Sequence, residues 1–542
     1  MKPLPAAPSL TLGLTLSLAG AGPARAQCPL EQWPLAGALP GDGTGLALAL
    51  SGDLAVIGAP YAGDPVPQAG VVYVVERLAG TWTQTARLLS PTPGVADRFG
   101  SAVAVAGDTI LVGEPFDDSS APEAGAVHVF AKGGGGWSDV QLLTAPGAVT
   151  GELFGHALAA AGDHLLVGAP TLTAAPGALP GPGTAYVFEH AAGAWQPSGE
   201  LVAADGFDGQ QFGFSVALHG DTALVGAPGY NVHVGQPGGY VFERAGGLWF
   251  PTAKLLGGGT SQQFGFAVAL HGDRALVGSP ADNQAGGNGV AWVFERQGFD
   301  WGPGQLLTAL KGGSLHRFGA SVALAGDVAL VGEPGNGLQG YMNGAAHLFH
   351  PAGDAWTQTL LLAHDTTAQL EFGAAVALDG GQALVTAPTG DPGQGGSTAY
   401  LWSAEPAPPL QAAPLALPVG AGGDQDFTLQ ACPGQAGATY LVFGSLALVG
   451  PSSPGLVYGG YLLPLEVDAY TLHTLANPNA PPLSGAQGVL DGAAQATARF
   501  TLPAGSNPAW IGTTLHHAFA VIEPAGLAVV LVSNAMPVEL VP

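Results

Sequence analysis

The sequence predicts an all-β protein: a seven-bladed β-propeller of four-stranded antiparallel blades, followed by a small β-sandwich-like domain. Three observations carry this prediction. A pattern typified by Phe212 to Pro228 (FGFSVALHGDTALVGAP) occurs seven times, at intervals of 52 to 58 residues. Each interval holds four short apolar or alternating runs, which are typical of strands. Many of the 87 glycines and 46 prolines bound these runs, where turns are expected.

Recurring positions keep the units in register. A proline ends the second run of every unit, and a Phe-Gly pair opens every unit except the first, which has Thr44-Gly45. The prolines are Pro60, Pro115, Pro170, Pro228, Pro280, Pro334 and Pro388. The phenylalanines are Phe99, Phe154, Phe212, Phe264, Phe318 and Phe372. Four antiparallel strands repeated radially describe a propeller blade, and the unit is too long for a leucine-rich solenoid.

The domain boundaries follow from where the repeat starts and stops. We assign residues 27–403 to the propeller, 404–418 to a Pro/Ala-rich linker and 419–542 to the β-sandwich-like domain. Trp33 and Leu35 resemble a fourth strand with no unit of its own, whereas the last unit, ending at Ser403, lacks one. We therefore predict that the N-terminal strand completes the seventh blade and hides an open sheet edge.

Residues 1–26 predict a secretory signal peptide. Lys2 precedes an apolar run from Leu10 to Ala19, and Ala24-Arg25-Ala26 supplies small residues before a cleavage site. A membrane-spanning helix needs about 20 apolar residues, more than this run provides. We therefore expect a secreted protein that is extracellular or associated with the cell surface, and no membrane span.

Two further features of the composition bear on partners and on redox state. The formal net charge of −26 argues against nucleic acid and anionic lipid as partners, because both require clustered Lys and Arg. The two cysteines, Cys28 and Cys432, either form a disulfide or remain apart, since a sequence does not give their spacing.

The Phe-Gly and Gly-Ala-Pro elements resemble the FG-GAP repeat of integrin α-subunit propellers and their bacterial secreted relatives, over about residues 30–403. The resemblance implies a seven-bladed propeller that binds ligands or mediates adhesion through one face. Many such repeats carry a calcium loop of the Asp-x-Asp-x-Asp-Gly type between the two elements. This sequence has only a tight turn there, such as His219-Gly220-Asp221-Thr222. One carboxylate cannot supply the six to eight oxygens that calcium takes, so no cofactor is expected, and calcium stays open as an alternative that no loop motif supports.

The variable loops that follow the prolines are the predicted ligand-binding face. By strand parity they leave the propeller on the face opposite the Gly-Asp turns, and loops on a rigid scaffold commonly carry binding residues. The candidates are Tyr61, Asp64, Phe116, Asp117, Asp118, Tyr230, Asn231, Asp282, Asn283 and Asp391. For each of them an ordinary solvated loop remains the alternative. Asp117, Asp118 and Glu123 are weak candidates for a divalent metal site, because their spacing matches no calcium-loop template.

These observations favour a secreted, non-catalytic binding or adhesion protein whose partner is an extracellular protein or a glycan. A secreted carbohydrate-active enzyme and a structural envelope component remain alternatives. Against the enzyme, no pair of carboxylates recurs in a way that suggests a general acid and base. Glu114 and Glu333 replace the usual Ala or Ser before the proline, and we expect them at a solvated rim of the central channel.

Overall fold

The computed structural model describes most of residues 22–404 and, beyond residue 410, mainly the strands named below. Within 22–404 the description omits residues 27–28, 40, 172–180, 230–235, 259–262, 283–286, 299, 310–315, 336–343, 354, 362–370 and 389–397. Every named element in the described part is a strand, which confirms the all-β class. No helix among the described residues is long and apolar enough to cross a membrane.

The first four blades are regular antiparallel sheets of consecutive strands. Blade 1 holds β3 (Ala47–Ser51), β4 (Leu54–Ala59), β5 (Val71–Leu78) and β6 (Thr81–Leu88). Blade 2 holds β7 (Ala102–Ala106), β8 (Thr109–Glu114), β9 (Ala126–Gly133) and β10 (Gly136–Leu143). Blade 3 holds β11 (Ala157–Ala161), β12 (His164–Ala169), β13 (Thr184–Ala191) and β14 (Ala194–Leu201). Blade 4 holds β15 (Ser215–His219), β16 (Thr222–Ala227), β17 (Gly238–Ala245) and β18 (Leu248–Leu255).

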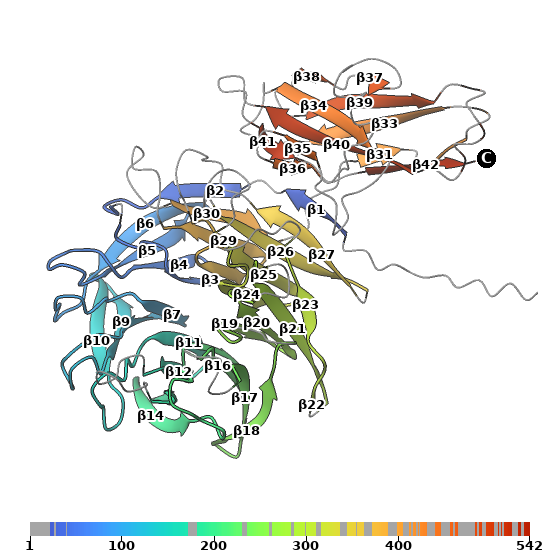
Figure 1. Cartoon of the computed structure of the whole chain (residues 1–542). Coiled ribbons are helices and arrows are strands. Elements are labelled where there is room, and N and C mark those ends of the chain that lie inside the picture. The colour runs from blue at the N-terminus through green and yellow to red at the C-terminus, as the bar shows by residue number, and fades with distance from the viewer. Residues whose placement is uncertain are drawn as a thin grey trace, which may run out of the picture.

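The remaining blades keep the same order with local changes at the outer strand. Blade 5 holds β19 (Ala267–His271), β20 (Arg274–Ser279) and β21 (Val290–Gln297), and its outer strand is split into β22 (Asp300–Trp301) and β23 (Gln305–Leu307). Blade 6 holds β24 (Ser321–Ala325), β25 (Val328–Glu333), β26 (Ala345–Ala352) and β27 (Ala355–Leu361). Blade 7 holds β28 (Val376–Asp379), β29 (Gln382–Ala387) and β30 (Thr398–Ser403). The inner strands contact one another in ring order, and β28 contacts β3 (Figure 1).

The N-terminal segment supplies the outer strand of blade 7. Strand β2 (Pro29–Pro34) pairs antiparallel with β30, placing Trp33 opposite Ala399. Strand β1 (Gly22–Ala26) pairs in parallel with β27 of blade 6. Because β1 lies inside the predicted signal peptide, cleavage after Ala26 would remove it and leave the four antiparallel strands of blade 6 in place.

The glycines of the repeat are required by the approach of neighbouring blades. Within a blade, the N–H of the Phe-Gly glycine donates to the carbonyl of the Gly-Ala-Pro glycine, as in Gly213 to Gly226 (3.1 Å). A Cβ on Gly226 would lie 2.1 Å from the carbonyl oxygen of Gly265 in the next blade. The seventh blade has Thr386 at this position, and its hydroxyl instead donates to the carbonyl of Gly45 in blade 1 (2.6 Å). The last residue before the Ala-Pro pair therefore lies where one blade packs against the next.

The phenylalanines of the repeat form the core between blades. The six Phe side chains of the Phe-Gly pairs are essentially fully buried. Each packs edge-to-face against an aromatic residue of the third strand, as Phe212 does against Phe242 with ring centroids 6.0 Å apart. This explains why the pair recurs at fixed spacing.

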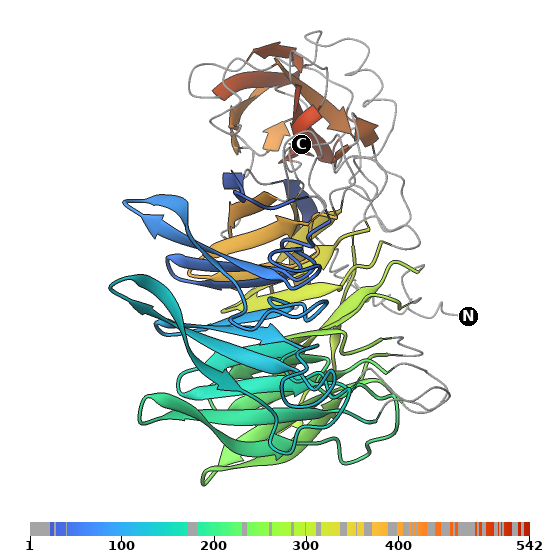
Figure 2. The ribbon, with the colours of Figure 1, turned by 90° about the vertical axis from the view of Figure 1, so that its left-hand side faces the viewer.

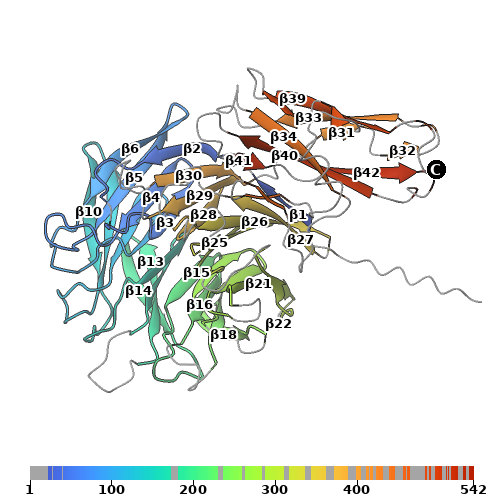
Figure 3. The same ribbon diagram turned by 45° about the horizontal axis from the view of Figure 1, so that its top comes forward.

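The C-terminal domain consists of two facing sheets, shown in orange and red in Figures 1 and 3. One sheet holds β31 (Gln411–Ala413), β33 (Gly423–Gln430), β37 (Leu483–Ser484) and β39 (Gln495–Leu502). The other holds β32 (Ala416–Pro418), β34 (Thr439–Ser445), β38 (Gln487–Val489), β40 (Thr514–Ile522), β41 (Val529–Val532) and β42 (Met536–Val541), and β35 (Leu456–Tyr458) with β36 (Tyr461–Leu463) forms a separate ribbon. Phe500 and His517 pack across the two sheets with ring centroids 5.3 Å apart.

The boundary of this domain differs from the predicted one. Strands β31 and β32 pair with β33 and β42, so residues 411–413 and 416–418 belong to the sheets of the domain rather than to the linker. The proline content that suggested a linker is compatible with short edge strands, since an edge strand has unpaired positions that tolerate proline.

Candidate functional site

The loop face brings together two of the predicted residues through a third that the sequence reasoning missed. The guanidinium carbon of Arg98 lies 4.4 Å from the ring centroid of Phe116 and 5.3 Å from that of Tyr61. Tyr61 follows β4 of blade 1, Phe116 follows β8 of blade 2, and Arg98 precedes Phe99. Tyr61 is 39% exposed and Phe116 is half-buried. We call these three residues the Arg98 cluster.

Arg98 is placed by the turn that opens blade 2. Its φ is +58°, and the residue before each later Phe-Gly pair also has a positive φ. The same turn recurs in these blades, whereas the residue type at this position varies from blade to blade. No hydrogen bond or ion pair of the Arg98 guanidinium is present among the described residues, and its Nε is buried without a partner. The cluster therefore presents hydrogen-bond donors that no described part of the chain satisfies.

Asp117 and Asp118 cap their own loop. Asp117 is buried, and its carboxylate accepts hydrogen bonds from the backbone N–H (3.0 Å) and the hydroxyl of Ser119. The exposed Asp118 accepts from the backbone N–H of Glu123 (2.7 Å). No group of three or more His, Cys, Asp or Glu side chains in the described part of the chain is arranged to hold a metal ion. The three weak metal candidates therefore form a stabilised turn here.

The other candidates divide between turn residues and undescribed residues. Asp282 is fully buried in the same turn of blade 5, with its N–H donating to the carbonyl of Ser279 (3.2 Å). Asp64 is exposed and forms an ion pair with Arg87 (2.6 Å). The candidates Tyr230, Asn231, Asn283 and Asp391, and both cysteines of the suggested disulfide, Cys28 and Cys432, lie outside the described residues.

A buried carboxyl group, that of Asp97, directly precedes Arg98 in the chain. Asp97 accepts a hydrogen bond from the backbone N–H of Gly94 (2.7 Å). Burial, reinforced by the nearby carboxylates of Glu114, Asp117 and Asp118, raises the pKa of Asp97 to about 6. Asp42 and Glu152 cap the corresponding turns of blades 1 and 3 in the same way. A role repeated in three blades is that of a turn cap, so the raised pKa does not by itself indicate catalysis.

Glu114 and Glu333 are not at a solvated rim, contrary to our expectation. Both are 0% exposed. The Oε2 atom of Glu114 lies 2.8 Å from Nε2 of His128, and that of Glu333 lies 2.8 Å from Nε2 of His347. Blades 2 and 6 have His128 and His347 where the other blades have Tyr or Trp. In these two blades Glu therefore replaces Ala or Ser, and His replaces the aromatic residue, at the same time. This paired exchange was visible in the sequence and would have indicated a buried ion pair.

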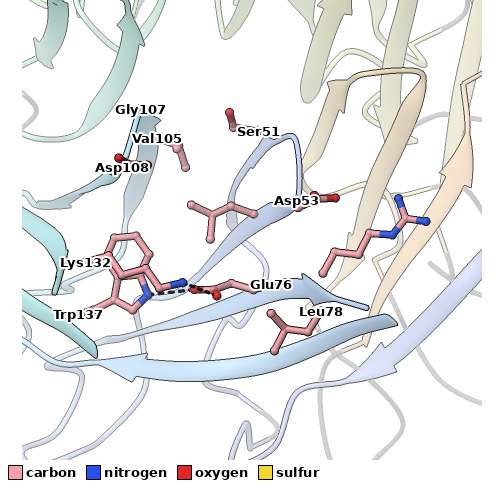
Figure 4. Close-up of a pocket in the computed structure, with 11 residues that line it drawn as sticks. Ser51, Asp53, Glu76, Leu78, Val105, Gly107, Asp108, Lys132 and Trp137 are labelled. Carbon is pink, nitrogen blue, oxygen red and sulfur yellow. Dashed lines mark hydrogen bonds and ion pairs between the residues drawn. The ribbon is translucent and has the colours of Figure 1, made fainter. Parts of the chain in front are cut away.

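The opposite face of the propeller contains a pocket of about 490 Å³ between blades 1 and 2. The Gly-Asp turns contribute Asp53 and Asp108, and the third and fourth strands contribute Glu76, Lys132 and Trp137 (Figure 4). Figure 2 shows the propeller edge on, with the long blue and teal hairpins that flank this region projecting to the left. Sequence reasoning treated the Gly-Asp turns only as hairpin chemistry and missed the pocket.

The described strands form a β-propeller with the Arg98 cluster on its loop face and a pocket on the opposite face. A family model described as the FG-GAP repeat matches residues 82–130, 137–188, 195–242, 249–294 and 301–349. These five matches confirm, across residues 82–349, the resemblance to the FG-GAP repeat that was inferred from the motifs.

Two solved structures show a distant likeness. One is described as "Structure of YjhT", with 14% identity, a TM-score of 0.34, and coverage of 59% of this chain and 97% of that one. The other is the β-propeller domain of the Trilobed protease from Pyrococcus furiosus, described as having an open velcro topology, with 9% identity, a TM-score of 0.40, and coverage of 66% and 95%. The search of curated proteins found no match.

Proposed function

We propose that this chain is a secreted, non-catalytic binding or adhesion protein. In this proposal the Arg98 cluster on the loop face recognises an extracellular protein ligand that presents a carboxylate. The FG-GAP propeller fold suggests a protein-binding or adhesion-type module. The observation that supports this site most strongly is the Arg98 guanidinium, which is flanked by two aromatic rings and has no partner among the described residues.

The chemistry of the cluster suits a carboxylate. A guanidinium offers a planar fork of N–H donors that a carboxylate accepts in pairs, and such charge-assisted bonds are stronger than neutral ones. Aromatic residues and arginine are enriched among the residues that dominate protein–protein binding energy. Tyr61 and Phe116 hold the guanidinium by cation–π contact, so little conformational entropy is lost when a ligand binds.

A peptide display library is a direct test, selected on the immobilised full chain with parallel selection on Arg98→Ala. We expect the enriched peptides to contain Asp or Glu, and to lose at least about tenfold in affinity on Arg98→Ala, since truncating a dominant interface arginine costs about 2 kcal/mol or more. Arg98→Lys should recover little, because lysine lacks the planar fork. Arg87→Ala is the matched control, since Arg87 is already paired with Asp64.

The outcome also separates the remaining alternatives. Enrichment that does not depend on Arg98, or no enrichment, would overturn this assignment of the binding site. Arg98-dependent binding of uronate oligosaccharides without any acidic peptide would replace the protein ligand with a glycan. Turnover of a polysaccharide panel by the purified chain would overturn the non-catalytic assignment.

A further inference from the structure

We propose that the pocket between blades 1 and 2, on the face of the Gly-Asp turns, binds a neutral sugar ring of a glycan. This site lies on the face opposite the Arg98 cluster and does not depend on the function proposed above. The pocket volume of about 490 Å³ falls within the usual range of small-molecule sites, about 300–1,000 Å³.

Two other junctions between blades place a cation or an aromatic ring against the tryptophan that corresponds to Trp137. At the junction of blades 5 and 6, the guanidinium carbon of Arg274 lies 5.7 Å from the ring centroid of Trp356. At the junction of blades 3 and 4, the ring of His164 lies 6.2 Å from that of Trp249. The equivalent residue in blade 1 is Leu54, an aliphatic side chain that brings neither a cation nor a ring to Trp137. Leu54 and Trp137 both line the pocket, and Lys132, of the same blade as Trp137, lines it as well.

Trp137 is held in place by a buried carboxylate. One oxygen of Glu76 accepts a hydrogen bond from Nε1 of Trp137 (3.2 Å), and the other lies 2.6 Å from Nζ of Lys132. Glu76 is buried, whereas Lys132 is half-exposed. The ammonium of Lys132 also lies 5.8 Å from the indole centroid. The orientation of the indole is thus fixed before any ligand arrives.

The rim supplies polar groups of both kinds. The carboxylates of Asp53 and Asp108 accept no hydrogen bond from any described residue, and they lie on two neighbouring turns (Figure 4). Lys132 is half-exposed and retains N–H donors beyond the one used by Glu76. Arg77 uses its Nε on the carbonyl of Gly80 (3.3 Å), which leaves its terminal N–H groups available. A site with fixed donors and acceptors around an aromatic ring suits a molecule that has apolar C–H faces and many hydroxyl groups.

The charge balance favours a neutral ligand. Asp53, Glu76 and Asp108 carry three negative charges, and Arg77 and Lys132 carry two positive ones. An anion would face the two unpaired carboxylates, and a cation would compete with Lys132 for Glu76. A neutral pyranose instead stacks its C–H face on Trp137 and exchanges hydroxyl hydrogen bonds with the rim.

A glycan array of neutral hexose and N-acetylhexosamine oligosaccharides, probed with the full chain, tests the proposal. We expect retention of at least one neutral glycan, with affinity reduced at least tenfold by Trp137→Ala and partly retained by Trp137→Phe. Glu76→Leu should weaken binding while leaving the chain folded, because the indole then loses the hydrogen-bond acceptor that fixes its orientation. Trp249→Ala is the matched control at the same position of blade 4, where His164 already contacts the ring, and it should bind as the wild type does.

Titration of indole fluorescence with free monosaccharides distinguishes a terminal sugar from an internal unit of a polymer. Quenching by the free sugar that is lost in Trp137→Ala supports recognition of a single ring, and binding of oligosaccharides alone supports an extended glycan. No neutral glycan retained by the wild type, or equal retention by Trp137→Ala, would overturn the proposal. Because Arg98→Ala leaves this pocket intact, glycan binding by that variant separates failure of this site from failure of the loop-face site.

Discussion

The pair of Glu114 and His128 allows a specific prediction of stability, because other blades have Ala and Tyr at the same two positions and show which residues can replace the pair. His128 is buried, with Nε2 2.8 Å from Glu114 and Nδ1 2.6 Å from Asp139. Glu114→Ala leaves this imidazole without its main partner, which typically costs about 3–5 kcal/mol. The double variant Glu114→Ala/His128→Tyr recreates the Ala and Tyr that blades 1, 3 and 4 carry at these positions.

The expected magnitude follows from the size of the propeller. Unfolding entropy is about 2.1 cal/mol/K per residue, so for about 370 residues a loss of 3–5 kcal/mol lowers Tm by about 4–6 °C. The double variant should recover to within about 1 kcal/mol of the wild type, since replacing a whole buried ion pair by well-packed apolar groups is often neutral. Differential scanning calorimetry of the full chain measures both values.

The same pair gives a pH dependence with a defined sign. Burial alone would lower the pKa of His128, but the hydrogen bonds that its ring donates to the carboxylates of Glu114 and Asp139 outweigh burial and raise that pKa above its usual 6.5. The stabilisation is therefore complete below about pH 6.5 and is lost as pH rises through the folded-state pKa. The double variant should lack this decline. A Glu114→Ala variant as stable as the wild type, or a double variant no better than the single one, would refute the reasoning.

Three further predictions concern the blade contacts, the turn cap and the ring closure. Gly226→Ala should prevent stable folding, because its Cβ would lie 2.1 Å from the carbonyl oxygen of Gly265. Gly220→Ala, in an open turn, should lower the free energy of unfolding by only about 1 kcal/mol. Urea unfolding compares the two variants. The raised pKa of Asp97 stabilises the native state only while the carboxyl group is protonated, so the wild type should lose stability as pH rises from about 4 to about 6. Asp97→Asn should remove this loss, which a plot of Tm against pH measures. Asp42→Asn controls for the change to a turn cap. A chain that begins at Gly41 lacks β2 and should melt earlier with an open blade 7, and a chain of unchanged Tm would contradict closure by that strand.

Much of the propeller could be predicted because its determinants are local and repeated. Three residues recur at fixed spacing: the buried Phe and the Gly of the Phe-Gly pair, and the Gly of the Gly-Ala-Pro element. Each is required by a contact that is present in successive blades. The predicted start of the C-terminal domain, residue 419, lies after the strands β31 and β32. These short strands carry no repeat and are defined only by partners that are distant in the sequence.

The sites were harder to predict because they depend on contacts between blades. Tyr61 and Phe116 were chosen as variable loop residues, but nothing local indicated that Arg98 would lie between them. The pocket at Trp137 is lined by Leu54 of blade 1 and by Lys132 and Trp137 of blade 2, which come together only once the neighbouring sheets are packed. Glu114 and His128 are 14 residues apart and meet because the β8–β9 register places them on the same face of blade 2.

Hydrogen–deuterium exchange of the full chain, with and without an enriched acidic peptide, tests the central claim most directly. The account predicts new protection in the loops after Pro60 and Pro115 and in the turn before Phe99, with the Gly-Asp turns unchanged. Protection confined to the Gly-Asp turns, or spread equally over the loops of all blades, would contradict binding at the Arg98 cluster.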